Sequence, residues 1–366
     1  MSNLRKGPVT IHDVAKLAGV SPSTVSHVIN GKHDRMRAAT CARVLSAVEE
    51  LGYAANQMAR GLKMGFVPTI GLVVPSVANP FWGEFARCVE HAAMARNYQV
   101  LLCNAERVPE RERRYVESML ARGIRGVILG SSPLSLKHLI GVTKRGLQVV
   151  AFDRLIQEGE GLDLDSVRVD NSLGSKLAIT HLLEHGHRRI AFVSGPLSSA
   201  SRGDRLEGYR GTLRAAGIEP DESLVWLENI PSAEEGEEEA TEIGRLAALT
   251  LLRAANPPTA FFAINDMTAV GIYAGVRELG LRIPEDVSVF GFDDIHLCKI
   301  MNPPISTVRQ PLGQLMRLVV ELLVDRMEGK NISPPVHLTL PPELVLRGST
   351  AKAPGRQIAS PIARNS

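Results

Sequence analysis

The chain has 366 residues and a formal net charge of +3, and 44% of its residues are hydrophobic and 22% charged. This length predicts two or three domains, and the composition is typical of a soluble globular protein. No apolar run reaches the roughly 18 residues that a membrane-spanning helix needs. The polar N-terminus has no apolar segment behind it, so we expect no signal peptide and a cytoplasmic protein.

The positive charge is concentrated near the N-terminus. Residues 1–65 hold nine Lys and Arg against four Asp and Glu, a balance of 9 − 4 = +5, and the rest hold 33 against 35, a balance of −2. A small basic module on a near-neutral body indicates a polyanionic partner for that module alone. The four cysteines are scattered without CxxC spacing, which favours reduced thiols over a metal site, and we expect no cofactor.

Residues 9–55 predict three short helices, because apolar residues recur there at helical spacing. Thr10 and Asp13 form a capping pattern for a first helix near residues 11–18. A glycine-containing turn follows, and Ser21 can cap a second helix whose first turn contains Pro22. Two short helices joined in this way form a helix-turn-helix, whose second helix enters the DNA major groove.

The second helix has an apolar face and a polar face. Val25, Val28 and Ile29 lie on the inward face, whereas Ser23, Thr24, Ser26 and His27 lie elsewhere. Short hydroxyls and an imidazole can hydrogen-bond base edges or phosphates. The alternative is a three-helix domain whose polar face is only solvated.

From residue 66 onward, strand-like apolar runs alternate with helical stretches. Strands are expected at residues 69–75, 99–103, 126–129, 148–152, 189–193, 259–264 and 287–292, and helices at 81–96, 111–122, 174–184, 205–216 and 267–279. Such alternation predicts parallel sheets with right-handed crossovers. The run is long enough for two such sheets.

The sequence contains no catalytic motif. It has no P-loop, no GxSxG and no Cys/His cluster with metal spacing. His181, His185 and His187 are expected in surface or capping roles.

A long N-terminal segment resembles the lactose/galactose repressor (LacI/GalR) family. The segment reads VTIHDVAKLAGVSPSTVSHVING over residues 9–31, and Leu51-Gly52-Tyr53 followed by Asn56 also matches. The resemblance continues through most of the chain. It implies a transcription regulator, most simply a repressor, that binds near-palindromic operator DNA as a homodimer and whose DNA affinity a small-molecule effector controls.

The resemblance also assigns DNA-contacting residues. Those matching Pro22, Ser23 and His27 face bases, and those matching Ser21, Thr24, Ser26, Asn30 and Thr40 hold the backbone; Thr10 and Asn56 complete the expected set. The family usually has Arg at the position of His27, and His cannot copy the bidentate contact of Arg to guanine. Arg37 replaces a capping Ser, but its charge can meet a phosphate.

The resemblance places a hinge helix after the helical head. Leu62 matches the leucine that the family inserts into the central minor-groove step, a wedge that bends DNA. Gly61 costs about 1 kcal/mol in a helix interior, so we expect a looser hinge. A flexible linker is the alternative.

The resemblance sets the expected domain boundaries. They are residues 1–55 for the helix-turn-helix head, 56–66 for the hinge, 67–347 for the effector-binding core and 348–366 for a disordered tail. Within the core, the N-lobe is expected at about 67–167 plus 299–328, and the C-lobe at about 168–297 plus 332–347. The core resembles periplasmic sugar-binding proteins, which implies two doubly wound α/β lobes joined by crossing strands, with the ligand between the lobes.

Open sheets bind ligands beyond the carboxyl ends of their strands, and several polar residues lie there. The expected effector-binding residues are Phe81, Trp82, Asp153, Arg205, Ile230, Asn265 and Asp293. Carboxylates, an amide and a guanidinium beside an aromatic face suit a polyhydroxylated ligand, so we expect a sugar or sugar derivative. For each acidic residue the alternative is a helix-capping role.

Three alternative functions remain open. The same architecture could bind a nucleobase or nucleoside, although aliphatic Ile230 makes a flat purine less favoured than a sugar. A sugar-binding receptor without DNA function is disfavoured by the helix-turn-helix. A sugar-processing enzyme is disfavoured by the missing catalytic groups, so we expect no enzyme.

Overall fold

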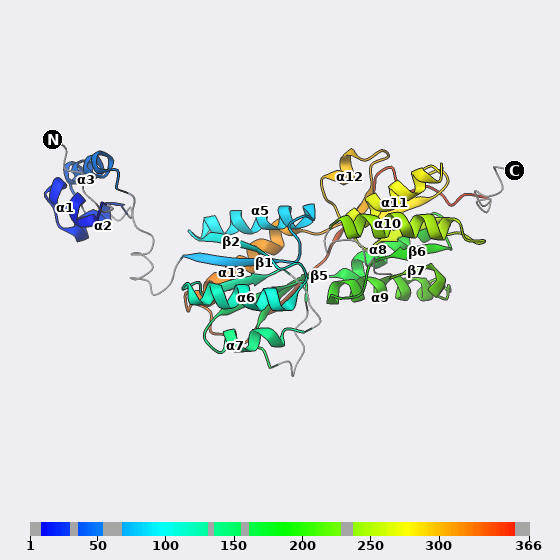
Figure 1. Cartoon of the computed structure of the whole chain (residues 1–366), viewed down its shortest axis with the longest axis horizontal. Coiled ribbons are helices and arrows are strands. Elements are labelled where there is room, and N and C mark those ends of the chain that lie inside the picture. The colour runs from blue at the N-terminus through cyan, green and yellow to red at the C-terminus, as the bar shows by residue number, and fades with distance from the viewer. Residues whose placement is uncertain are drawn as a thin grey trace. The chain divides into compact units, whose positions relative to one another are not determined.

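The computed structural model describes residues 9–29, 36–53, 68–130, 135–154, 161–227 and 237–355. The chain divides into two compact units, Met1–Val67 and Pro68–Ser366, both drawn in Figure 1. The expected hinge, with Asn56 and Leu62, lies outside the described residues, as do Asn30 and Ile230.

The first unit contains α1 (Ile11–Ala18), α2 (Pro22–Ile29) and α3 (Ala38–Leu51). Asp13 accepts hydrogen bonds from the backbone N–H and the hydroxyl of Thr10, as the capping pattern predicts. Gly19 ends α1 at φ 62°, a conformation that glycine adopts without strain. The three helices pack around a small core: Val14, Ala15, Ala18, Val25, Val28, Val44 and Ala47.

The second unit begins with a six-stranded, all-parallel sheet. In spatial order its strands are β11 (His337–Leu340), β5 (Asp165–Val169), β4 (Gln148–Phe152), β3 (Gly126–Leu129), β1 (Thr69–Val74) and β2 (Gln99–Asn104). Its helices are α5 (Pro80–Ala95), α6 (Pro109–Ala121), α7 (Ile140–Thr143) and α13 (Leu312–Met327), with a short 3-10 helix at Lys137–Leu139. The central strands are continuous apolar runs because both faces of a parallel sheet are covered.

The second sheet also has six strands. Their order is β12 (Glu343–Val345), β10 (Ser306–Arg309), β9 (Ser288–Asp293), β8 (Ala260–Ala263), β6 (Ile190–Val193) and β7 (Val225–Trp226), with only β12 antiparallel to its neighbour. Its helices are α8 (Asn171–Glu184), α9 (Ala200–Ala215), α10 (Glu237–Leu252), α11 (Asp266–Glu278) and α12 (Leu297–Ile300), with a 3-10 helix at Glu222–Leu224. The expected two-lobed, doubly wound fold is thus confirmed (Figure 1).

The expected lobe boundaries need correction. The sequence predicts β10 in the N-lobe, but β10 pairs with β9 and β12 in the second sheet. It predicts β11 in the C-lobe, but β11 pairs with β5 in the first sheet. The chain therefore crosses between the lobes after β5, after β10 and after β11. Backbone pairing between strands that are distant in the sequence decides these boundaries. The local pattern of apolar and polar residues does not show which strands pair.

The expected tail also needs correction, because its first residues are ordered against the second lobe. Ser349 is fully buried, and its hydroxyl donates to Val289 O at 2.6 Å. The backbone N–H of Ala353 donates to His185 O at 2.8 Å. The tail thus continues the packing of this lobe at least to residue 353.

The surface roles expected for two of the three histidines are wrong. His187 is 0% exposed and hydrogen-bonds Thr259, Ser288 and Ala351 O, while His181 is buried and contacts Thr350. Burial lowers the pKa of His187 to about 4, so this ring is neutral near pH 7. These buried imidazoles hydrogen-bond the C-terminal segment and hold it against the second lobe. The sequence alone does not reveal this role, because the contacts join residues that are far apart in the chain.

Candidate functional site

A cavity of about 130 Å³ lies in the second unit where strand ends from both sheets meet. Its lining includes residues that follow β2, β3, β4 and β8 and the last residue of β9, all at the carboxyl ends of these strands. The expected residues in this lining are Phe81, Trp82, Asp153, Arg205, Asn265 and Asp293. The structure therefore brings together six of the seven residues expected at the effector site; the seventh, Ile230, lies outside the described residues.

The first lobe contributes an aromatic wall at the start of α5. Asn79 caps this helix by accepting a hydrogen bond from the backbone N–H of Phe81 at 2.9 Å. The Phe81 and Trp82 rings meet edge to face at 4.9 Å between centroids, and Trp82 also packs on Phe85. A Cβ at Gly130 would lie 2.9 Å from the Trp82 ring, so the absent side chain makes room for the indole.

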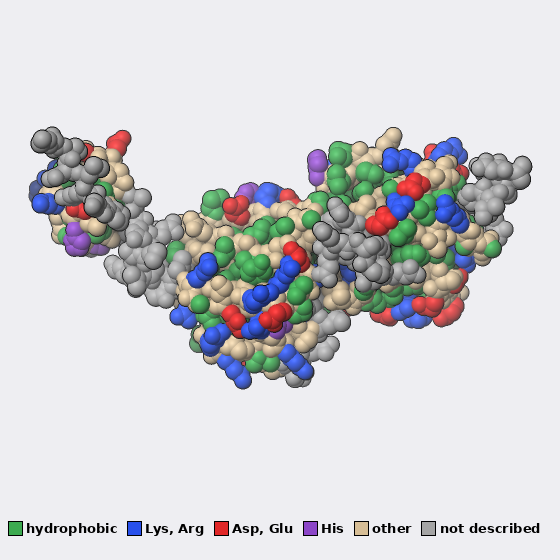
Figure 2. Space-filling model, in the orientation of Figure 1, with side chains coloured by type: hydrophobic (Ala, Val, Ile, Leu, Met, Phe, Trp, Pro, Cys, Tyr) green, Lys and Arg blue, Asp and Glu red, His purple; other side chains and the backbone are tan. Residues whose placement is uncertain are grey.

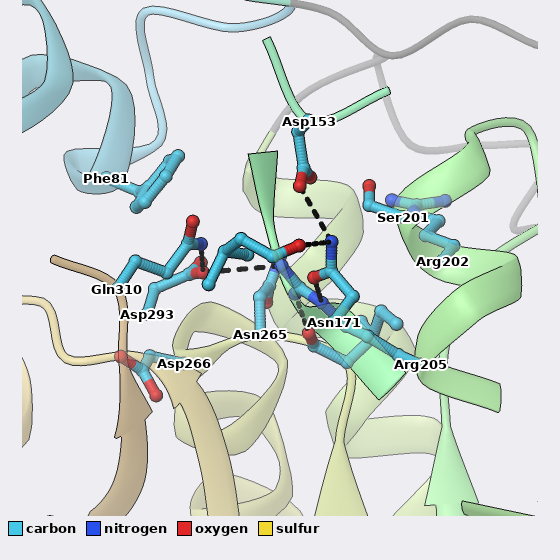
Figure 3. Close-up of polar contacts among 12 residues, drawn as sticks. Phe81, Asp153, Asn171, Ser201, Arg202, Arg205, Asn265, Asp266, Asp293 and Gln310 are labelled. Atoms are coloured by element: carbon cyan, nitrogen blue, oxygen red, sulfur yellow. Dashed lines mark hydrogen bonds and ion pairs between the residues drawn. The ribbon is translucent and has the colours of Figure 1, made fainter. Parts of the chain in front are cut away.

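A chain of hydrogen bonds connects the two lobes through Asn171 (Figure 3). Its Nδ2 donates to Asp153 Oδ1 at 2.7 Å, and its Oδ1 accepts from Arg205 Nε at 2.8 Å. Asp153 follows β4 of the first lobe, whereas Asn171 and Arg205 belong to α8 and α9 of the second. The carboxylate and the guanidinium are thereby held in a fixed relation across the cleft.

Arg205 is fixed on several sides. Its Nη1 donates to Ile264 O at 2.5 Å, and its guanidinium carbon lies 3.6 Å from the centroid of the Phe292 ring, a cation–π contact. Asp293 Oδ1 lies 3.7 Å from Arg205 Nη2 and accepts a hydrogen bond from Gln310 Nε2 at 2.8 Å. A long, flexible side chain is thus preorganised at the cavity wall.

Two carboxylates of the cavity lining, Asp153 and Asp293, are desolvated. Burial raises the pKa of Asp153 to about 6, although Arg205 and Asn171 act in the opposite direction. Burial also raises the pKa of Asp293 well above its usual range, again against Arg205. Both residues have positive φ, 57° at Asp153 and 120° at Asp293, a strained backbone of the kind that gathers at functional sites.

Asn265 has two roles at once. Its side chain caps α11 by accepting from the backbone N–H of Thr268 at 2.8 Å, and it also lines the cavity. Asn265 therefore caps a helix and still belongs to the site. The next residue, Asp266, does not line the cavity; it accepts from Thr307 Oγ1 and Ile295 N and ties the strand ends together.

Several lining or linking residues were not expected from the sequence. They are Arg107, Glu112, Asn171, Ser198, Ser199, Ser201, Arg202 and Gln310. Asn171 and Gln310 follow β5 and β10, two strands absent from the expected set. A search for polar residues after every short β-branched run, such as Ser306–Arg309, could have found them.

The helical head presents its expected DNA-contacting residues on and beside α2. Ser21 caps this helix by accepting from Thr24 N at 3.2 Å, and its hydroxyl also meets Ser23 Oγ at 2.7 Å. Ser23 and His27 are exposed four residues apart, on a face away from buried Val25. The second helix is therefore apolar inward and polar outward.

Of four further expected residues of the head, three lie at helix starts and one lies within α2. Pro22 begins α2, and Ser26 lies within it, partly exposed. Arg37 precedes α3 without making a side-chain cap, which leaves its exposed guanidinium available to a phosphate, and Thr40 lies in the first turn. The head therefore carries a solvent-facing hydrogen-bonding surface, while Asn30 and Asn56 lie outside the described residues.

Together the fold and the cavity define a class of protein: a two-lobed ligand-binding unit in one chain with a helix-turn-helix head. None of the helices in the described ranges is long and apolar enough to cross a membrane. The model for bacterial regulatory proteins of the lacI family matches residues 10–56, and that for a periplasmic binding protein-like domain matches residues 179–350.

The chain is similar along nearly its whole length to known regulators. It is 35% identical to the ribose operon repressor of Escherichia coli K12, over 93% of this chain and 99% of the repressor. A structure of the lac repressor dimer bound to operator and the anti-inducer ONPF matches with a TM-score of 0.79 at 28% identity, covering 94% of this chain and 100% of that one. A ribose-bound regulator from Enterococcus faecium matches with a TM-score of 0.67 at 32% identity, covering 78% and 99%.

The chain therefore belongs to the lacI family of bacterial regulatory proteins and is a DNA-binding transcriptional regulator with an effector-binding domain. The family expected from the sequence is confirmed, as is the fold class.

Proposed function

We propose that the cavity binds a sugar, and specifically a pentose of the ribose type, and that this effector controls operator affinity. The observation that carries the proposal is Gln310. Its Oε1 is buried and has no hydrogen-bond partner among the described residues, while its Nε2 is held by Asp293. A buried acceptor without a partner costs about 1–3 kcal/mol, so a ligand that donates a hydrogen bond there gains affinity.

The surrounding groups suit hydroxyls because a hydroxyl both donates and accepts. Asp153 and Asp293 offer acceptors, Arg205 and Asn265 offer donors, and Phe81 offers an apolar surface. Figure 3 displays these groups around one space between the lobes. Such a mixture of charge-assisted donors and acceptors discriminates sugars by the positions of their hydroxyls.

The pentose assignment also draws on relatives. One relative is named a ribose operon repressor, and the Enterococcus faecium regulator was solved with bound ribose. A nucleobase or nucleoside remains the second candidate effector, as expected from the sequence. It belongs in the same binding panel as the sugars.

We propose that effector binding acts by closing the lobes. Asp153 belongs to the first lobe and Arg205 to the second, so a ligand that hydrogen-bonds both favours one relative arrangement of the lobes. Affinity for DNA changes only as far as the effector binds one arrangement better than the other. The sequence contains no catalytic motif, which supports a regulatory role without enzymatic activity, and a regulator that binds bacterial operator DNA acts in the cytoplasm.

We propose a homodimer that pairs through the sensor lobes. Apolar side chains are exposed on α12 and its surroundings (Figure 2), where Ile300 is 65% exposed. On the first lobe, Met94 on α5 and Leu101 and Leu102 on the edge strand β2 are exposed as well. A two-fold interface would cover these residues and would match a near-palindromic operator.

On the DNA side, we propose that α2 reads the major groove. Pro22, Ser23 and His27 would face bases, and Ser21, Thr24, Ser26, Asn30, Arg37, Thr40 and Thr10 would hold the backbone. Asn56 and Leu62 would act in the hinge, with Leu62 as the minor-groove wedge.

The test is a selection of bound sequences from random duplex DNA, repeated with ribose, other pentoses, hexoses, and purine bases and nucleosides. We expect a near-palindromic sequence to be enriched and its affinity to change with a pentose. Binding of the effector alone is measured in parallel by calorimetry. A protein that prefers no duplex and binds none of these metabolites would contradict the proposed function.

A further inference from the structure

Four exposed cations lie at the amino ends of two central strands of the first sheet. Arg122 follows α6 and Arg125 directly precedes β3, while Lys144 and Arg145 lie in the turn between α7 and β4. Because β3 and β4 are neighbouring parallel strands, their amino ends lie at the same edge of the sheet. We call these four residues the basic edge. Figure 2 shows Lys and Arg side chains around α7 in this part of the first lobe.

The two loops that hold the basic edge contact each other. The backbone N–H of Gln148 donates to Arg125 O at 2.8 Å. A Cβ on Gly146 would lie 3.9 Å from Arg125 Nη1, so the Arg125 guanidinium lies beside the turn that contains Lys144 and Arg145. Like charges at such short range repel one another, and a bound anion would relieve this repulsion.

The cations of the basic edge are not neutralised within the described part of the chain. Arg125 and Lys144 make no side-chain hydrogen bond or ion pair with any described residue, and Arg145 donates to Gly141 O at 3.2 Å. The described loops at this end also hold Asp163, an exposed carboxylate, so the edge keeps a net positive charge. Several other arginines of this lobe do pair with carboxylates: Arg87, Arg96, Arg111, Arg113 and Arg326.

The basic edge lies at the end of the first lobe to which the helical head is connected. β1 begins at Thr69 and runs parallel to β3 as its direct neighbour, so β1 also starts at this edge. The connecting residues 54–67 are 14 in number and span at most about 50 Å. The carboxyl ends of both sheets meet at the effector cavity, so the amino ends of the second sheet lie away from this connection. The head is therefore tethered to the edge that carries the four cations.

The basic edge also stays accessible in the proposed homodimer. The exposed apolar residues of the first sheet, Leu101 and Leu102, are on the outer strand β2. β3 lies two strands away from β2 and β4 three strands away. At a spacing of about 4.8 Å between strands, the cations are about 10 to 14 Å from the strand that a partner would cover.

We propose that the basic edge binds phosphates of the operator DNA that the head holds, as a second contact that does not read sequence. Lys and Arg that neutralise DNA phosphates release counterions, so each such contact adds to the salt dependence of binding. The first lobe then contacts DNA itself. This inference adds DNA-binding residues outside the head and hinge, and it does not depend on which effector the cavity binds.

The experiment measures the affinity of the full-length protein for a duplex centred on the sequence that the selection enriches, at salt concentrations from about 0.05 to 0.3 M. The test variant is Arg125→Gln with Lys144→Gln. The rescue variant is Arg125→Lys with Lys144→Arg, which keeps both charges. The matched control is Lys176→Gln with Arg253→Gln, which removes one lysine and one arginine from exposed positions on α8 and after α10 in the second lobe.

For the test variant we expect a plot of log affinity against log salt that is shallower by about one to two, because each lost phosphate contact contributes about 0.9. This change corresponds to binding that is about tenfold or more weaker at about 0.1 M salt. The rescue and control variants should keep the wild-type slope and affinity.

Three results would overturn the phosphate contact. They are an unchanged slope in the test variant, an equal change in the control variant, which would assign the effect to net charge, and a loss of affinity by the same factor at every salt concentration. A wild-type protein that enriches no duplex would instead contradict the proposed function, so the two failures are distinguishable.

Discussion

Asn171 donates a hydrogen bond to Asp153 across the boundary between the lobes, with 2.7 Å between Nδ2 and Oδ1. Through its Oδ1 the same amide also accepts from Arg205. One buried side chain thus positions the principal anion and the principal cation of the cavity. Its removal should disturb both.

We therefore predict that Asn171→Ala weakens effector binding about tenfold to a hundredfold, because two buried charged groups each lose a partner worth about 1–3 kcal/mol. Calorimetry with the effector measures the loss. Asn256→Ala is the control, since that side chain is exposed and lies away from the cavity lining. An unchanged affinity in Asn171→Ala would show that the amide does not organise the site.

Effector affinity should depend on pH through Asp153. Burial raises the pKa of this carboxyl to about 6 in the free protein. Hydroxyls that donate to the ionised carboxylate lower its pKa in the complex, so binding releases a proton when the pH is below about 6. Affinity should be constant above this pH and fall by up to tenfold per unit below it.

The measurement is the dissociation constant between pH 4.5 and 8. Asp153→Asn should bind more weakly at pH 8 and lose the Asp153 part of the pH dependence. Asp293 remains in the variant, and burial also raises the pKa of this residue. Asp293 therefore makes its own contribution to the dependence of effector affinity on pH. Identical pH profiles for the two proteins would contradict the role of Asp153.

Folding stability should also depend on pH through His187. The pKa of this buried ring is lowered to about 4, below its value of about 6.5 in an unfolded chain. The unfolded state then binds more protons between these values, so stability contributed by the neutral ring is present above pH 6.5 and lost as the pH falls toward 4. The full loss corresponds to about 3 kcal/mol.

Denaturant unfolding at several pH values tests this expectation. His187→Gln should lower stability at neutral pH, because Thr259, Ser288 and Ala351 lose hydrogen-bond geometry. The informative quantity is the slope of stability against pH, which should be flatter in the variant between pH 4 and 6.5. Equal slopes would assign the pH dependence to other groups.

Operator preference should change with His27. Arginine forms a bidentate contact with guanine that histidine cannot form, worth about 1–3 kcal/mol of discrimination. We predict that His27→Arg enriches guanine at one position of each half-site in a selection from random duplexes. His12→Arg adds the same charge at an exposed position on α1 and should leave the selected sequence unchanged.

Self-association should depend on the apolar surface at α12. Ile300→Glu places a charge on a residue that is 65% exposed in the single chain, and we predict a weaker dimer by at least about tenfold. Ile332→Glu is the control, because Ile332 is 92% exposed on a different surface segment. Analytical ultracentrifugation measures both; equal dimerisation of the two variants would place the interface elsewhere.

Much of the fold could be predicted from local pattern. The expected strands at residues 126–129 and 148–152 coincide with β3 and β4, because continuous apolar runs of four or five residues are characteristic of a covered parallel sheet. β5 and β10 were not expected, since their sequences mix polar and apolar residues. Ser166 and Thr307 are buried there only because His337 and Asp266 hydrogen-bond them from elsewhere in the chain.

The missing strands explain the missing site residues. Asn171 follows β5 and Gln310 follows β10. A secondary-structure prediction that lacks these two strands therefore does not place either residue at the cleft. Asp153 and Asn265, in contrast, follow strands that the sequence does reveal. The sequence could therefore predict where the cavity lies. It could not predict all of the residues that line the cavity or connect its charged groups.

By itself the sequence determined the helix-turn-helix, the alternation of strands and helices, and the polar residues at strand ends, because periodicity and capping act between residues close in the chain. Only the tertiary structure decided which lobe holds β10 and β11, that His187 is buried, and that Asn171 joins Asp153 to Arg205. These features depend on sheet order and on contacts between residues that are far apart in the chain, and no local pattern encodes such contacts.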